Sequence, residues 1–339
     1  MRSAIKFERN WCFFMEIICS SPLSGSMREQ TRAFLQDAGL DWDEAVQTTI
    51  NLVENGAICA TGSRQDNMLK CIAVNKLHEG EGLTATVVSE LIKNAFMNGH
   101  RHLFLFTKPE NMEKFGSLGF YPIAETKDVI LLENLKKGVE TFVERLEKPK
   151  TEGITGAIVA NCNPFTNGHR FLIETAAKSC GLVHLFILSE DRSSFPTHVR
   201  LELAKQGTAD IDNVVVHPTS SYMVSSATFP DYFIKDKVKS KKINCELDLT
   251  IFAECFAKPM GIQRRYVGSE PNDPVTASYN QQMHNLLPAL GVDVIEIPRL
   301  QENGAFVSAS TVRRLLAQGS LEKLRALLPP TTYAYLERM

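Results

Sequence analysis

A short apolar segment, followed by a turn and a helical pattern, is the feature that most constrains the fold of this chain. Residues 157–160 read Ala-Ile-Val-Ala, which is typical of a buried parallel strand, and the pair Asn163 and Pro164 ends this run. Apolar residues then recur at helical spacing over residues 171–177, and Gly181 stands where a helix end is expected. The order of strand, tight turn and helix predicts one unit of a parallel α/β sheet.

The predicted turn carries Thr166, Gly168 and His169 directly before the helix. Exposed backbone amides and the positive end of the helix dipole favour a phosphate group at such a place. Gly168 lets the backbone bend or approach a ligand closely. Thr166 supplies a hydroxyl, and His169 supplies an imidazole that can donate to a phosphate oxygen and, when protonated, offset developing charge. The alternative is an ordinary Asn-Pro turn with a helix-capping residue.

The stretch Asn-Pro-Phe-Thr-Asn-Gly-His, residues 163–169, resembles the T/H-x-G-H signature of the nucleotidyltransferase superfamily. Members of that superfamily bind a nucleoside triphosphate and attack its α-phosphate, with release of pyrophosphate. The resemblance implies that Thr166 and His169 are catalytic. Asn163 stands where many of these proteins carry Asp, so we assign it no proton-transfer role.

A second phosphate-binding pattern occurs near the C-terminus. Residues 306–314 read Phe-Val-Ser-Ala-Ser-Thr-Val-Arg-Arg, so hydroxyl side chains precede a predicted helix that carries arginine. Hydroxyls and helix amides can hold a triphosphate, and an arginine adds a fixed charge. The pattern resembles the superfamily's second motif, I-S-S-T-x-x-R. Thr-x-x-Arg spacing from Thr311 indicates Arg314, rather than Arg313, as the catalytic arginine; the alternative is a helix cap with a surface arginine.

We expect the other ATP contacts on loops that follow predicted strands, because open parallel sheets bind ligands at the carboxyl ends of their strands. The expected ATP-binding residues are Asn161, Asn163, Gly168, Arg200, Gly268, Glu270, Ser308, Ser310 and Thr311. Lys235 lies in a stretch, residues 220–242, that mixes hydroxyls, aromatic residues and lysines. That stretch could be a lid over the phosphates or a solvated surface helix.

The first half of the chain resembles the GNAT acetyltransferases over roughly residues 10–135. Residues 79–84, Glu-Gly-Glu-Gly-Leu-Thr, stand where that family has Q/R-x-x-G-x-G/A, the turn whose amides hold the coenzyme A pyrophosphate. The resemblance implies a thiol-cofactor site at Gly80, Gly82, Leu83 and Thr84. Glu79 departs from the family pattern, and Glu81 adds negative charge beside the proposed pyrophosphate. This domain could therefore keep the acetyltransferase fold without catalysing acetyl transfer from acetyl-CoA. It would then bind a thiol cofactor or have a purely structural role. Residues 41–52 could form a helix.

These patterns predict an α/β protein with two domains. Residues 1–145 form the GNAT-like domain, residues 146–153 a polar linker containing Pro and Gly, and residues 154–339 the ATP-binding domain. Repeated strand-helix order in the second domain predicts a doubly wound parallel sheet of the Rossmann-like, H-x-G-H nucleotidyltransferase type.

Composition limits the partners and the compartment. A net charge of −2 argues against a dominant nucleic-acid or membrane surface, and no apolar run reaches the roughly 18 residues of a membrane span. Eight cysteines without a C-x-x-C pair indicate neither a metal site nor a disulfide framework, so we expect a cytoplasmic protein. Residues 11–19 imitate a signal peptide, but Glu16 interrupts them, so we predict a strand over residues 13–19.

The order of the two domains, together with both phosphate motifs, resembles the citrate lyase ligases over nearly the whole chain. Further matching stretches are residues 162–169, 207–211, 227–230 with 233–235, and 275–280. The resemblance implies that ATP, with Mg²⁺, and acetate form acetyl-adenylate, and that the acetyl group passes to a thiol. That thiol belongs to the prosthetic group on the acyl carrier subunit of citrate lyase. Alternatives are an adenylyl- or cytidylyltransferase in cofactor biosynthesis, an acetyltransferase that uses acetyl-CoA, and a non-catalytic regulator.

Overall fold

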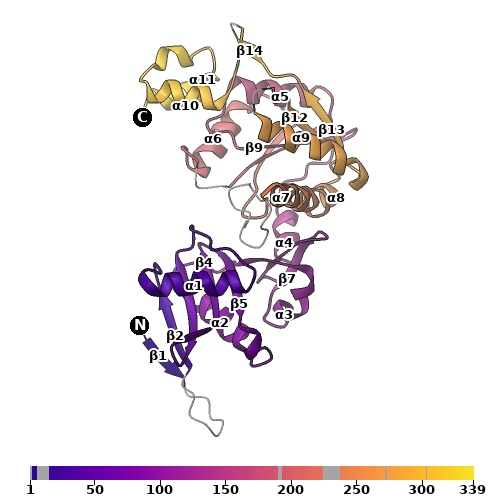
Figure 1. Ribbon diagram of the computed structural model, residues 1–339. Coiled ribbons are helices and arrows are strands. Elements are labelled where there is room, and N and C mark those ends of the chain that lie inside the picture. Colours follow the sequence, from indigo (N-terminus) through magenta and orange to yellow (C-terminus); the bar gives the residue numbers. More distant parts are fainter. Residues whose placement is uncertain (1, 6–14, 190–192, 224–236, 272, 303) are drawn as a thin grey trace. The chain divides into compact units, whose positions relative to one another are not determined.

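The computed structural model of the chain describes residues 2–5, 15–189, 193–223, 237–271, 273–302 and 304–339. These residues form two compact units (Figure 1). The first unit holds the described residues up to Gly138 and those from 237 to 247, and the second holds the remainder from Val139 onward. Within the described ranges, no helix has the length and hydropathy needed to cross a bilayer. Lys235 lies outside the described residues.

The first unit is built on a mixed sheet with strand order β1-β2-β3-β4-β5-β6-β8-β7. The strands are β1 (Arg2–Ile5), β2 (Met15–Ser20), β3 (Thr48–Glu54), β4 (Ala57–Gln65), β5 (Met68–Val74), β6 (Phe104–Thr107), β7 (Tyr121–Glu125) and β8 (Ile130–Glu133). The helices are α1 (Gly25–Asp37), α2 (Leu83–Met97) and α3 (Met112–Gly116). The helix considered for residues 41–52 is wrong, because the run Thr-Thr-Ile-Asn-Leu-Val from Thr48 is rich in β-branched residues and forms β3.

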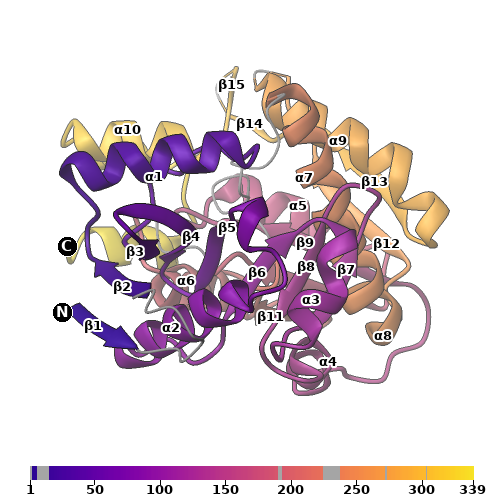
Figure 2. The ribbon, with the colours of Figure 1, turned by 60° about the horizontal axis from the view of Figure 1, so that its bottom comes forward.

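Helix α2 covers the sheet with an apolar face. Its buried residues include Val87, Val88, Leu91 and Ala95, which recur at helical spacing and share one core with residues of strands β3 to β6. Figure 2 shows α2 beside the sheet. This packing fixes the start of the helix, and with it the turn over residues 79–84.

Strands β5 and β6 are parallel, and they pair only at their first residues. Met68 lies opposite Phe104 and Leu69 lies opposite Leu105, with no pairing registered further along. Beyond this point a cavity of about 580 Å³ is lined by residues that include Ile72, Val74, Phe106 and Thr107. Strands that part after a short parallel pairing therefore open a groove in the sheet. We call it the β5–β6 groove.

The second unit contains a five-stranded parallel sheet with the order β11-β10-β9-β12-β13. The strands are β9 (Thr155–Ala160), β10 (Leu182–Ile187), β11 (Val214–Pro218), β12 (Arg264–Gly268) and β13 (Asp293–Ile297). The helices are α4 (Gly138–Glu144), α5 (Asn167–Ala177), α6 (Thr197–Gly207), α8 (Lys258–Met260), α9 (Pro274–Leu286), α10 (Ala309–Ala317) and α11 (Pro330–Leu336). Helix α7 (Lys237–Ile251) belongs to the first unit up to Leu247 and to the second unit from Asp248. A two-stranded ribbon pairs β14 (Gln301–Glu302) with β15 (Ala305–Phe306).

The chain winds outward from β9 to β10 and β11, and then returns to the other side of β9 with β12 and β13. This confirms the expected α/β class with a doubly wound parallel sheet. The strand order reverses between β9 and β12, and the crevice at their carboxyl ends is where such sheets bind ligands. The loops that leave β9, β10, β12 and β13 all reach this edge.

The C-terminal helices are held by a small apolar cluster of their own. Val312 of α10, Leu324, Leu328 and Tyr333 are buried together with Phe195 of the loop after β10. This cluster fixes helix α10 against the loops at the sheet edge. Helix α10 carries the second phosphate motif, so its packing positions the site.

Candidate functional site

The start of helix α5 is closed by the side chain of His169. Thr166 is the N-cap, and its hydroxyl oxygen accepts from the backbone N–H of His169 at 3.4 Å. In return, His169 Nδ1 accepts from the backbone N–H of Thr166 at 3.0 Å, which completes a capping box. Thr166 is buried and His169 is partly buried. The motif residues are thus held rigidly by the helix terminus that they form.

This hydrogen bond fixes which nitrogen of His169 can act on a ligand. Because Nδ1 accepts a backbone N–H, the neutral ring carries its proton on Nε2. Burial, together with the positive charge of Arg299, lowers the pKa of His169 to about 4. The imidazole is therefore neutral at pH 7 in the ligand-free protein. It offers Nε2–H as a hydrogen-bond donor to a phosphate oxygen, and it does not offset charge as an imidazolium before ligand binds.

Gly168 brings the two phosphate motifs into contact. A Cβ at this position would lie 2.9 Å from the carbonyl oxygen of Val307, the residue just before the N-cap of α10. Such a distance is shorter than real Cβ contacts, so only glycine fits without moving the backbone. The start of α10 therefore lies directly against the start of α5.

The hydroxyls of the second motif form the cap of α10. Ser308 is the N-cap, and its oxygen accepts from the backbone N–H of Thr311 at 3.2 Å. The Ser308 hydroxyl also lies 3.0 Å from the hydroxyl of Ser310 and 3.0 Å from that of Thr311. The structure thus brings Ser308, Ser310 and Thr311 together beside Gly168, which places hydroxyl donors at two adjoining helix starts.

The two neighbouring arginines of α10 have different surroundings. Arg313 donates from Nη1 to the backbone carbonyl of Asn163 at 2.6 Å, so it ties α10 to the turn after β9. Arg314, the residue indicated by motif spacing, is exposed. The geometry favours Arg313 as the arginine that organises this site.

Arg200 is completely buried and forms hydrogen bonds to the loops around it. Its guanidinium donates to the backbone carbonyls of Asn161 at 2.7 Å, Leu188 at 2.7 Å and Phe195 at 3.0 Å. It also donates to the side-chain oxygen of Asn161 at 2.7 Å. These contacts join the segments that leave β9 and β10. Arg200 therefore shapes the rim of the crevice through the backbone, and its donors are engaged by protein.

The two asparagines after β9 are also engaged by protein. Asn161 accepts from Arg200, and the side-chain oxygen of Asn163 accepts from the backbone N–H of Phe195 at 3.1 Å. Asn163 is buried. Its amide thus anchors the loop after β10 to the turn that carries Thr166.

The loop after β12 adds a charged pair at the same sheet edge. Glu270 lies 2.8 Å from Arg299, which follows β13. Burial raises the pKa of the Glu270 carboxyl, while the positive charge of Arg299 opposes that shift. Gly268 accepts from the side chain of Asn280 at 3.0 Å. The positive charge of Arg299 also contributes to the lowered pKa of His169.

The 79–84 turn in the first unit is an open helix start. Gly82 is the N-cap of α2, with φ +77°, and no side chain caps this end. A Cβ at Gly80 or Gly82 would meet nothing within 4 Å, so the backbone is accessible from outside. A cavity of about 290 Å³ is lined by residues that include Gly80, Gly82, Leu83 and Thr84. This is a cradle of free amides, as an anionic phosphate requires.

Three lysines lie among the residues that line these two cavities. Lys114 of α3 lines the cavity at the turn, and Lys76 and Lys108 line the β5–β6 groove. Glu79 lines both spaces. The cradle and the groove thus share a wall, which suits a ligand with an anionic end and a long neutral arm.

Motif spacing favoured Arg314 over Arg313, and motif reading missed Arg299 and Lys114. The V-S-x-S-x-x-R spacing counted from Val307 ends at Arg313, so an alternative register of the second motif contains the signal for it. Arg299 and Lys114 belong to no pattern, and only the fold brings them to their sites. With neutral His169, hydroxyls and two helix starts, the second-unit site can bind and polarise a polyphosphate.

The family model "Citrate lyase ligase C-terminal domain" matches residues 155–336. The citrate (pro-3S)-lyase ligase of Klebsiella pneumoniae is 39% identical over 318 residues, which cover 92% of this chain and 93% of that protein. The same-named protein of Haemophilus influenzae is 39% identical over 315 residues, covering 91% and 94%. Among solved structures, Thermotoga maritima TmcAL bound with alpha-thio ATP is similar with 16% identity and a TM-score of 0.36, covering 55% of each chain.

The contrast between the two arginines can be tested by ATP binding. We expect Arg313→Ala to weaken ATP binding by about 10-fold or more, because the loss of a charged hydrogen bond of roughly 1.5–3 kcal/mol loosens the turn that carries His169. Arg314→Ala, the matched control on an exposed neighbour, should stay within about twofold. Isothermal titration of both folded variants measures this. A larger loss in Arg314→Ala would assign the phosphate contact to Arg314 instead.

Proposed function

The chain belongs to the citrate lyase ligase family, and from this membership we propose that it activates citrate lyase by ATP-dependent, AMP-forming acetylation. The single observation that carries the proposal is the 39% identity to citrate lyase ligases over nine-tenths of both chains. The acceptor is the thiol of the prosthetic group on the acyl carrier subunit of citrate lyase. The reaction consumes ATP and acetate and yields AMP, pyrophosphate and the acetyl thioester.

The first step joins acetate to the α-phosphate of ATP. One acetate oxygen attacks the α-phosphorus, the bond to the bridging oxygen breaks, and pyrophosphate leaves with that oxygen. Acetate needs no base, because a carboxylic acid is already ionised at neutral pH. The barrier comes from bringing an anion to an anionic phosphate, so the site must neutralise charge and align the reactants. Mg²⁺ arrives on the triphosphate as part of the substrate, and we assign it no protein ligand.

We assign the roles in this step from the contacts at the two helix starts. Nε2–H of His169 donates to an α-phosphate oxygen, because Nδ1 is already used by the Thr166 backbone. The backbone amide of Gly168 and the first amides of α10, with the hydroxyls of Ser308, Ser310 and Thr311, hold the other phosphate oxygens. Arg313 keeps the turn in place, and Arg299 supplies positive charge. Gly268 and Glu270 lie after β12 at the carboxyl edge of the sheet, and we assign the nucleoside to this edge because open parallel sheets bind ligands there.

The second step transfers the acetyl group to the thiol. The thiolate attacks the acetyl carbonyl carbon, and AMP leaves with the oxygen that came from acetate. We assign the thiol arm to the β5–β6 groove and its phosphate to the 79–84 turn. The free amides at Gly82, Leu83 and Thr84, with Lys114 nearby, support this assignment. No acetyl-CoA is consumed, so the GNAT-like unit holds an acceptor instead of a donor.

A pyrophosphate assay separates this proposal from the alternatives. We expect pyrophosphate release from ATP to depend on acetate, and to continue for many turnovers only when the thiol form of citrate lyase is added. Release that ignores acetate but requires a phosphorylated cofactor precursor would indicate an adenylyl- or cytidylyltransferase. Acetylation from acetyl-CoA without ATP would indicate an acetyltransferase. If the protein binds ATP but releases no pyrophosphate under any of these conditions, it is a non-catalytic regulator.

A second prediction separates the two steps. Gly82→Trp should fill the cradle and reduce acetyl transfer to the lyase thiol by at least about tenfold, since the arm's phosphate must lie against this backbone. A single turnover of acetate-dependent pyrophosphate release should remain. Gly99→Trp is the matched control, because Gly99 follows α2 with φ +83° and open space, like Gly82 with φ +77°. Equal acetyl transfer by both folded variants would remove the thiol arm from the 79–84 turn.

A further inference from the structure

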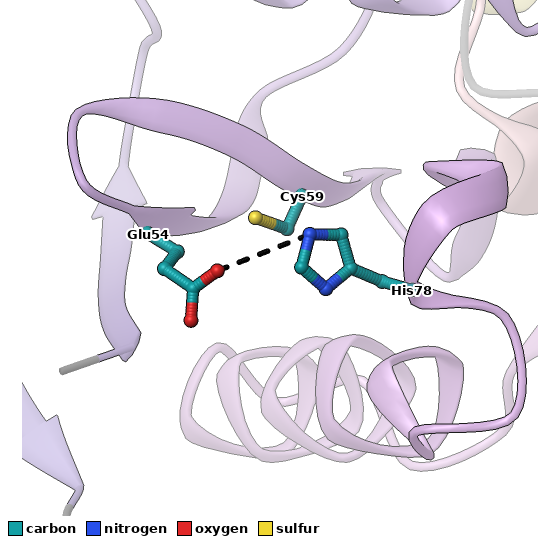
Figure 3. A group of neighbouring side chains, drawn as sticks. All are labelled: Glu54, Cys59 and His78. Carbon is teal, nitrogen blue, oxygen red and sulfur yellow. Dashed lines mark ion pairs between the residues drawn. The ribbon is translucent and has the colours of Figure 1, made fainter. Parts of the chain in front are cut away.

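Three side chains to which the proposed reaction assigns no role face one another in the first unit (Figure 3). Glu54 ends β3, Cys59 lies in β4, and His78 ends the short turn that follows β5. One ligand atom of each, a carboxylate oxygen, a thiol sulfur and a ring nitrogen, lies within 4.8 Å of the other two. We propose that these residues bind a divalent cation, and that Zn²⁺ is the cation the donor set selects.

The chemistry of the donors favours zinc over the hard cations. Zn²⁺ accepts sulfur, imidazole nitrogen and carboxylate oxygen, whereas Mg²⁺ and Ca²⁺ prefer sites made of oxygen alone. Bond lengths of about 2.0–2.3 Å around a tetrahedral Zn²⁺ place its ligand atoms roughly 3.3–3.8 Å apart. Ligand atoms that lie within 4.8 Å of one another reach that spacing by side-chain movements of roughly 1 Å. Three protein ligands leave a fourth position for water or another ligand.

An irregularity in the sheet directs Cys59 toward this place. Leu52 pairs with Ala60 and Val53 pairs with Ile58, so the register shifts and Cys59 is the extra residue between them. The backbone carbonyl of Cys59 accepts from the N–H of Asn75, just before the turn that bears His78. A bulge of this kind re-aims a side chain and is common beside functional sites.

Glu81 orients the imidazole as the outer carboxylate of a metal site does. His78 Nδ1 lies 3.0 Å from a carboxylate oxygen of Glu81. A proton on Nδ1 leaves the lone pair of Nε2 directed away from Glu81, and Nε2 lies 4.0 Å from Glu54. That separation is too long for a hydrogen bond, and it is slightly longer than the roughly 3.3–3.8 Å between two ligand atoms of a tetrahedral Zn²⁺. Metal-bound histidines usually donate their second nitrogen to a carboxylate in this way.

The cation would connect the β3–β4 hairpin to the segment that leads into α2. His78 also lines the cavity at Gly80 and Gly82, so a bound ion would fix one wall of that cavity. Binding replaces the proton of the Cys59 thiol by the Zn²⁺–sulfur bond and releases that proton to solvent. The inference concerns the metal site alone and does not depend on the proposed ligase activity.

Metal titration of the full-length, metal-free protein tests the proposal. We expect one Zn²⁺ per chain in competition with a chromophoric chelator, and Co²⁺ should give thiolate charge-transfer absorption with tetrahedral visible bands. Cys59→Ser should abolish the charge-transfer band, and His78→Gln and Glu54→Gln should each weaken Zn²⁺ binding about 100-fold. Glu81→Gln should weaken it about 10- to 100-fold, as the loss of an outer partner does elsewhere.

Cys19→Ser is the control, because Cys19 is an exposed cysteine in the neighbouring strand β2. Its affinity and its Co²⁺ spectrum should equal those of the unmodified protein. Binding that survives both Cys59→Ser and His78→Gln, or that disappears in Cys19→Ser, would overturn the site. So would a protein that takes up no Zn²⁺ from an equimolar chelator. If Cys59→Ser does not fold, the variants of the half-buried His78 and the exposed Glu81 decide the question.

Discussion

The close approach of two helix starts is the constraint on which the second unit depends. Each start carries roughly half a positive charge from its unpaired amides, so placing α5 and α10 together is unfavourable without an anion. Gly168 permits the approach, because any larger residue would collide with the carbonyl of Val307. The cost is offset by the apolar cluster around Val312 and by the Arg313 contact to Asn163. A triphosphate bound between the two helix starts would reduce the electrostatic repulsion between their positive ends.

The first unit also has a helix start that can bind an anion, but this start is built differently. There the start of α2 has no side-chain cap, and its amides face a cavity with Lys114 on the wall. In α5, Thr166 and His169 close the helix start with a capping box. The capping box fixes the orientation of the imidazole, which is the group that the motif offers to a ligand. One helix start therefore suits a transient anionic group that comes and goes with a long arm. The other suits a reacting phosphate whose surroundings must not move.

Local pattern predicted the elements that stand at the second-unit site. The apolar run 157–160 became part of β9, and the turn at Thr166 leads directly into α5, because strand period, a Pro turn and a cap are local signals. The choice between Arg313 and Arg314 was not local, since it depends on which face of α10 meets Asn163. Arg200 carried no signal of burial, because its partners are backbone carbonyls from distant loops.

The remaining sites could not be found from sequence for similar reasons. Arg299 pairs with Glu270 only because β13 lies beside β12, and Glu54, Cys59 and His78 meet only through a register shift and a turn. The central claim is that acetate attacks the α-phosphate, and acetate labelled with ¹⁸O in both oxygens tests it most directly. Mass spectrometry should find one ¹⁸O in the AMP released after transfer to the lyase thiol, and none in pyrophosphate. Label absent from AMP while acetyl thioester still forms would contradict an acetyl-adenylate.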